Sequence, residues 1–330
     1  MSKANNIIIL EMPDYEQIVL MRGWEGLADR LQILSHCIHY CKVHNAAICV
    51  DWRDYMWGQE TLDFHDYFEI VGIPTVPLQE VLLRIEKGAS ISPPTWDLMM
   101  IADPPNQSDH FKHFDSLIDN SYTKIKGDIL VNNSRGLRMW HLDNMISNLR
   151  LQKSVSDLII ERLTNLSLPF TAVHLRGTDR LEGKNVTQAI YTAVTSFEKL
   201  LPHARSRNYI VSDMKEMVAE WIKKFPGAQQ VFSDYAVHKI PSGLQGTHQL
   251  PKEALDFYGI KKHELNLDTL TDFIIICFSN WSVGNSQAST FTTLSTFLSQ
   301  SGKKGIAKWL GGWEPQQKPL SATLDVSIEA

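Results

Sequence analysis

Cysteine is scarce in this chain of 330 residues, and long apolar runs are missing from it. Three of the four cysteines lie in the first half and one in the second, which is not the spacing of a disulfide framework. No stretch reaches the roughly 18 consecutive apolar residues of a membrane-spanning helix, and the first residues lack the apolar core of a signal peptide. We therefore expect a cytoplasmic protein without a transmembrane segment.

An excess of basic charge is also lacking. The chain has 32 basic and 37 acidic residues, a net charge of −5, and both signs are spread along its length. Such a chain offers no basic face for a nucleic-acid backbone, so nucleic acid is not expected as a partner. With 43% hydrophobic and 21% charged residues, the composition is that of a globular protein, and the length suffices for two domains.

The first half begins with the pattern of a strand, a turn, a helix and a second strand. Residues 18–21 are apolar, "RGWEG" follows, residues 27–44 carry apolar side chains at helical spacing, and residues 46–50 form a second apolar run. This order predicts a βαβ unit with a parallel sheet. Proline-rich loops follow up to residue 138, with weak strands expected at 96–101 and 128–131.

The second half alternates strands and helices more regularly. After a helix at 154–165, strands are expected at 170–175, 208–213, 229–233 and 281–285, and helices at 185–201, 217–225, 264–279 and 290–298. We predict an α/β protein of two facing Rossmann-like domains with a cleft between them, residues 1–150 and residues 151–330.

Polar side chains follow three of the strands expected in the second half. They are His174 to Arg180, Ser212 with Asp213, and Asn285 to Thr290. Ligands of open α/β sheets bind at the carboxyl ends of the strands, and arginine there suits a phosphate. The pattern favours a nucleotide diphosphate, with Asp213 and Asp272 placed to read ribose hydroxyls or base amino groups.

Each part of this pattern also has a purely structural interpretation. Arg176 and Asp179 are equally consistent with a surface ion pair. Ser212 and Asp213 alone are typical of a helix N-cap. Only their joint position on successive strand ends favours a binding site.

Three segments resemble one family of enzymes. "VHLRGTD" resembles the H-x-R-x-x-D signature of the fucosyltransferase superfamily that includes the rhizobial nodulation α1,6-fucosyltransferase, the core α1,6-fucosyltransferase and the protein O-fucosyltransferases. "RGWEGLADRLQIL" followed by "VDWR" is similar to its glycine turn, helix and second strand, and "LTDFIIICFSNWSVGNSQASTFTTL" to its late helix, strand and [ST]-[ST]-F-[ST] turn. The three matches occur in the family's order and extend from Gly23 to Leu294.

The resemblance implies a GT-B fold and an inverting, metal-independent transfer of fucose from GDP-fucose to a hydroxyl of a glycan or glycoconjugate. The second domain would bind the donor and the first the acceptor, with no cofactor. Arg176 would hold the β-phosphate and stabilise the departing GDP. The remaining donor-site residues implied are His174, Asp179, Asp213, Asp272, Ser289, Thr290, Phe291 and Gly26.

The first turn departs from the family pattern. It reads Gly23-Trp24-Glu25-Gly26 rather than two adjacent glycines, and Ala28 replaces a usual glycine. A glutamate before a glycine here is similar to one class of protein O-fucosyltransferases, in which it is the catalytic base. Glu25 is therefore a candidate base, and it fits equally well as a carboxylate at the positive end of the following helix.

Two other motifs suggest different ligands. Gly23-x-x-Gly26 with Asp51 after the next strand mimics a dinucleotide fingerprint but lacks the G-x-G-x-x-G spacing. Cys37, Cys41 and His44 share one helix face but have no fourth ligand at zinc-like spacing, so no metal is expected.

An aromatic cluster follows the second strand. We expect Trp52 in the core and Tyr55 and Trp57 at the acceptor site, where rings stack on sugars. Two alternatives to the fucosyltransferase stay open: the same fold using another nucleotide sugar, and a non-catalytic glycan- or nucleotide-binding protein.

Overall fold

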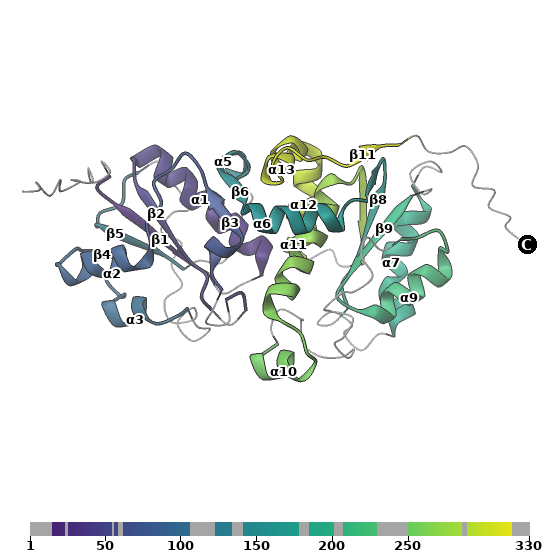
Figure 1. Cartoon of the computed structure of the whole chain (residues 1–330), viewed down its shortest axis with the longest axis horizontal. Coiled ribbons are helices and arrows are strands. Elements are labelled where there is room, and N and C mark those ends of the chain that lie inside the picture. Colours follow the sequence, from purple (N-terminus) through teal and green to yellow (C-terminus); the bar gives the residue numbers. More distant parts are fainter. Residues whose placement is uncertain are drawn as a thin grey trace, which may run out of the picture.

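The computed structural model describes residues 15–23, 26–54, 56–58, 62–105, 123–133, 141–177, 185–200, 207–229, 250–285 and 289–318. Figure 1 shows two α/β parts at opposite ends of the long axis, with helices between them. Both parts contain parallel sheets, as the sequence predicts.

The first sheet has the order β2-β1-β5-β4 and is parallel throughout. Its strands are β1 (Ile18–Arg22), β2 (Ala47–Asp51), β4 (Ile91–Ser92) and β5 (Ile129–Asn132), and α1 (Leu27–His44) connects β1 to β2. Alternate residues of β1 face opposite sides, so Val19 and Met21 pack in one apolar cluster and Ile18 and Leu20 in another. The predicted βαβ unit is confirmed.

One expected strand is instead a helix. Residues 96–101 were expected to form a strand, but α3 (Leu98–Ala102) occupies this stretch. The Asp97 carboxylate accepts a hydrogen bond from the Met100 backbone N–H at 2.8 Å, which caps the helix. The other elements around the first sheet are η1 (Phe64–Asp66), β3 (Phe68–Ile70) and α2 (Leu78–Glu86).

The second sheet has the order β10-β8-β9 and is also parallel. Its strands are β8 (Thr171–Leu175), β9 (Asn208–Ser212) and β10 (Trp281–Gly284), each within one residue of its expected start. On one face α7 (Val186–Glu198) and α9 (Lys215–Lys224) enclose a separate apolar cluster with Val173 and Leu175. Short β7 (Ser167–Leu168) and β11 (Gln316–Gln317) pair beside it.

The middle of the molecule is built from segments far apart in the chain. It comprises α5 (Leu142–Asn148), β6 (Leu149–Leu151), α6 (Lys153–Arg162), α11 (Lys262–Phe278), α12 (Thr290–Ser301) and α13 (Lys303–Trp309) (Figure 1). One apolar cluster runs from Val19 in the first sheet to Ala172 in the second through these helices. The domain boundary predicted at residue 150 falls inside β6, which pairs antiparallel with β3.

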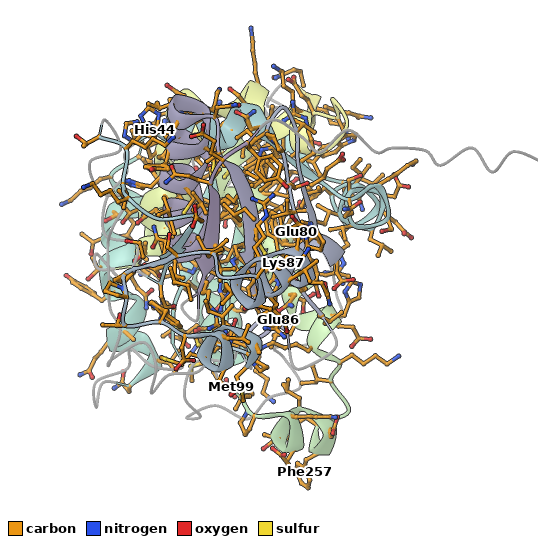
Figure 2. All side chains as sticks on the ribbon, turned by 90° about the vertical axis from the view of Figure 1, so that its left-hand side faces the viewer. His44, Glu80, Glu86, Lys87, Met99 and Phe257 are labelled. Carbon is orange, nitrogen blue, oxygen red and sulfur yellow. The ribbon has the colours of Figure 1, made fainter. Side chains whose placement is uncertain are left out.

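A small lobe projects from the start of α11. It contains α10 (Lys252–Phe257) and has an apolar cluster of its own. Figure 2 shows Phe257 at its far end, where the side chain is 81% exposed. Among the helices that the structure describes, none is both long and apolar enough to cross a membrane.

Candidate functional site

The carboxyl ends of β8, β9 and β10 form one edge of the second sheet. The register pairs His174 with Gly284 on one side and Leu175 with Ser212 on the other. The residues that follow these strands are therefore neighbours. Hydrogen bonds join Arg176 to Asn285 and Gly177 to Asp213 across the edge.

His174 connects strand β8 to helix α12. Its Nδ1 atom lies 2.5 Å from the hydroxyl oxygen of Thr292, and its ring lies 5.4 Å from that of Phe291. Desolvation of the half-buried imidazole, together with the charge of Arg176, lowers the pKa of His174 to about 3. The imidazole is therefore neutral at pH 7 and serves as a hydrogen-bonding group, since a base this weak cannot remove a proton from a hydroxyl efficiently.

The backbone of Arg176 is held on both sides by one side chain. Its N–H donates to Oδ1 of Asn285 at 2.8 Å, and its carbonyl accepts from Nδ2 of Asn285 at 2.8 Å. The Arg176 side chain is half-buried at this edge. The guanidinium that this backbone carries has the charge and the paired donors that a phosphate requires.

Gly177 lies against the neighbouring connection between β9 and α9. Its N–H donates to Oδ1 of Asp213 at 2.7 Å. A Cβ atom at Gly177 would lie 2.6 Å from Sδ and 2.9 Å from Cβ of Met214, so only glycine fits without a shift.

The N-cap expected at Ser212 and Asp213 differs in the structure. Helix α9 begins at Lys215 with Met214 as its N-cap and no side-chain cap. The Ser212 hydroxyl instead donates to the Leu175 carbonyl at 2.7 Å and accepts from the Met214 N–H at 3.1 Å. The side chains of Ser212 and Asp213 therefore form hydrogen bonds with the residues on either side of Arg176.

The N-terminus of α12 points a helix dipole at this region. Ser289 caps it by accepting from the Thr292 N–H, and its own side chain is buried. The first turn contains no acidic residue, so its positive end is not neutralised from within the helix. Among the predicted residues, Thr290 is the first of α12, and Ser289 acts as a cap.

Phe291 of α12 and Asp272 of α11 belong to neighbouring helices. The Phe291 ring is 5.4 Å from that of Phe273, the residue after Asp272 in α11. Asp272 itself is half-buried on this helix. The hydrogen bonds therefore bring together His174, Arg176 and Asp213 with the cap of α12.

Three predicted residues remain. Glu25 and Asp179 lie outside the described residues. Gly26 is the N-cap of α1 at φ −66°, and a Cβ there would meet no atom within 4 Å, so this position does not require glycine.

The aromatic cluster after β2 belongs mainly to the core. Trp52 is fully buried, as expected. Trp57 is only 4% exposed and packs edge-on against Trp52 and Tyr67, which corrects the expectation that its ring faces a sugar. Tyr55 lies outside the described residues.

The dinucleotide alternative is not supported at Asp51. Its carboxylate accepts from Nε of Arg22 at 3.1 Å and from Nε of Arg53 at 2.8 Å. Arg22 also donates to the carbonyls of Met100 and Asp103. Asp51 is thus committed to a buried ionic network at the edge of the first sheet and is not available to a ribose.

A second buried ionic group lies between the first part of the molecule and α11, and no motif in the sequence indicates it. Nη2 of Arg30 donates to Oδ2 of Asp54 at 2.8 Å, and both side chains are fully buried. Lys262, at the start of α11, is buried near both, and desolvation lowers its pKa to about 7. Only folding places Lys262 beside Asp54, so no local pattern could reveal the group.

The cysteine and histidine pattern on α1 is not a metal site in the described part of the chain. Cys37 and Cys41 are buried free thiols whose pKa values are raised by burial. No group of three or more potential metal ligands occurs among the described residues.

Comparison with known proteins gives a structural match only. No family model and no curated protein matches the sequence. The structure of NodZ α-1,6-fucosyltransferase co-crystallised with GDP is similar, with a TM-score of 0.59 and 15% identity over 86% of this chain and 92% of that chain. Fucosyltransferase NodZ from Bradyrhizobium aligns with a TM-score of 0.59 and 14% identity over 86% and 93%. The chain therefore has the two-domain, GT-B-type fold of these fucosyltransferases, as the sequence predicts.

Proposed function

We propose that the protein is an inverting glycosyltransferase that moves fucose from GDP-fucose to a hydroxyl of a glycan or glycoconjugate. The observation that carries this proposal is the fixed position of Arg176 at the edge of the second sheet. The fold shared with NodZ, one structure of which was co-crystallised with GDP, supports it.

Arg176 is proposed to bind the β-phosphate of the donor. The bond from the anomeric carbon to the phosphate oxygen breaks with its electron pair on GDP, so negative charge grows on that phosphate. A guanidinium already in place stabilises this charge, and one such donor is commonly worth a factor of about 10²–10³ in rate. The N-terminus of α12 adds a favourable dipole on the same side.

The acceptor hydroxyl is proposed to attack the anomeric carbon from the face opposite GDP. A new carbon–oxygen bond forms as the old one breaks, which inverts the configuration. The hydroxyl proton must go to a base, and His174 is too weak a base for this because its pKa is about 3. We assign the proton to Glu25.

Metal independence and a cytoplasmic location belong to the same proposal. In this proposal, the guanidinium of Arg176 and the dipole of α12 would balance the charge of GDP in place of a metal ion. The acceptor would bind against the first domain, where the loops between residues 72 and 108 are the place to look for specificity.

A thermal-shift titration with GDP, GDP-fucose, GDP-mannose, UDP-glucose and NAD tests the donor. A ligand that binds only the folded state stabilises it by about 2.7 kcal/mol at a hundredfold excess over Kd. We expect GDP and GDP-fucose to raise the melting temperature without added metal, and UDP-glucose and NAD to leave it unchanged. No shift with GDP or with GDP-fucose would overturn the proposal. Stabilisation by GDP-mannose in place of GDP-fucose would identify a different donor sugar.

A further inference from the structure

The paired part of strand β10 ends before it comes level with Arg176. Its last register pair joins Gly284 to His174. The next backbone N–H, that of Asn285, donates to the His174 carbonyl at 3.4 Å. Among the residues that the structure describes, the backbone ladder between β8 and β10 thus ends before Arg176.

The side chain of Asn285 continues the ladder where the backbone stops. Its amide oxygen accepts from the Arg176 N–H and its amide nitrogen donates to the Arg176 carbonyl, both at 2.8 Å. A primary amide is the side-chain group that offers a donor and an acceptor on one planar unit. Aspartate would lose the donor, and glutamine would place the amide one methylene too far from the backbone.

The opposite side of the loop is fixed as well. Gly177 is bonded to Asp213 and packed against Met214, so the peptide after Arg176 cannot move toward α9. With Asn285 in place, the Cα atom of Arg176 is held between β9 and β10. Loss of the Asn285 amide removes the hydrogen bonds to the Arg176 backbone and leaves the bond between Gly177 and Asp213 intact.

We propose that Asn285 is a positioning residue that orients Arg176 toward the β-phosphate of the donor. This inference rests on the proposed function, in which Arg176 binds that phosphate. A displacement of about 1 Å at such a group can cost a factor of about 10² in rate. Asn285 thus acts on the nucleotide through Arg176 and not by direct contact.

The test compares the affinities of GDP and GMP, which differ by the β-phosphate. The dissociation constant of GMP divided by that of GDP measures the β-phosphate interaction. This ratio is insensitive to a general loss of stability. We expect Asn285→Ala to reduce this ratio by about tenfold, as expected for weakening a charged hydrogen bond. Arg176→Ala should reduce it at least as much, and adding Asn285→Ala to Arg176→Ala should cause no further change.

Asn280→Ala is the matched control. The Asn280 side chain accepts from the Phe170 N–H at 3.2 Å, so it also bonds the backbone next to β8, but at the opposite end of the strand. If Asn285 only stabilises the sheet, both substitutions will affect melting and neither will change the GDP to GMP ratio. That result, with a folded Asn285→Ala protein, overturns the inference.

A second Asn285 variant controls for misfolding of the first. The GDP and GMP affinities of the parent protein distinguish a failure of the proposed function from a failure of this inference. Asn285→Leu keeps the bulk of the side chain without its hydrogen bonds and should give the same lowered ratio. If the parent protein binds GDP no better than GMP, the proposed role of Arg176 fails and the inference fails with it. If the parent protein binds GDP more tightly than GMP and both Asn285 variants keep the same preference, only the inference about Asn285 fails.

Discussion

Nδ1 of His174 and the hydroxyl of Thr292 lie 2.5 Å apart, which joins the end of β8 to the first turn of α12. One turn further along α12, the Thr296 hydroxyl lies 2.8 Å from that of Ser282 in β10. The helix is therefore attached to two strands of the sheet through one face. The first attachment lies at the candidate site, and the second lies on the edge strand β10, further from the carboxyl ends of the strands.

Thr292→Val should weaken GDP binding several-fold and lower the free energy of unfolding by about 1 kcal/mol, since it removes one hydrogen bond and leaves the His174 ring free to turn. Thr296→Val is the matched control, and it should lower stability by a similar amount without affecting GDP. Isothermal titration and urea unfolding measure the two effects. Equal GDP affinities for the two variants would contradict the role of the His174–Thr292 contact.

Arg176→Ala should lower the turnover of GDP-fucose by about 10²–10³-fold, because the charge on the departing GDP loses its guanidinium. Arg176→Lys should recover only part of this loss, since an ammonium group lacks the planar pair of donors. Release of GDP from GDP-fucose is the measurement. A turnover of Arg176→Ala within threefold of the parent would show that the donor phosphate lies elsewhere.

Gly177→Ala should destabilise the protein by about 1–3 kcal/mol, because the new methyl group would overlap Met214 at the start of α9. Gly227→Ala is the control, since a Cβ there meets no atom within 4 Å. Urea unfolding of both variants gives the comparison. The prediction is wrong if Gly177→Ala unfolds at the same urea concentration as Gly227→Ala.

Lys262→Met should flatten the dependence of stability on pH between about 7 and 10. Burial lowers the pKa of Lys262 from 10.5 to about 7, so the folded protein disfavours the charged form. Stability should therefore fall as the pH drops from 10.5 toward 7 and level off below 7, by at most about 1.4 kcal/mol per pH unit. Removing the amine should also raise stability near pH 7, because desolvation is the largest influence on its pKa and exceeds the attraction of the nearby Asp54 carboxylate.

Urea unfolding at pH 7, 8 and 9 measures this effect. Lys261→Met, at the exposed neighbouring position, is the control and should keep the slope of the parent. Parallel curves for the parent and Lys262→Met would show that the buried amine keeps its charge throughout this range.

Local patterns predicted the strands well where one or both faces are buried. Residues 18–21 and 170–175 were recognisable because every side chain of β1, and all but His174 of β8, are buried. The stretch 96–101 was misassigned because α3 is too short to display a helical period, and its cap at Asp97 is a single residue. Trp57 was misplaced because aromatic side chains occur both in cores and at sugar-binding sites, and the sequence does not distinguish them.

The sequence by itself determined the alternation of strands and helices, the polar ends of β8, β9 and β10, and the residue types that suit a phosphate, because these depend on periodicity and on neighbours along the chain. Tertiary structure alone decided which of those polar groups meet. Asn285 forms hydrogen bonds with the backbone of Arg176, which is 109 positions away in the chain. Lys262 lies beside Arg30 and Asp54 because α11 returns to the first part of the molecule. Hydrogen bonds and buried charges act over a few ångströms in space, so their partners are set by the packing of the core and not by distance along the sequence.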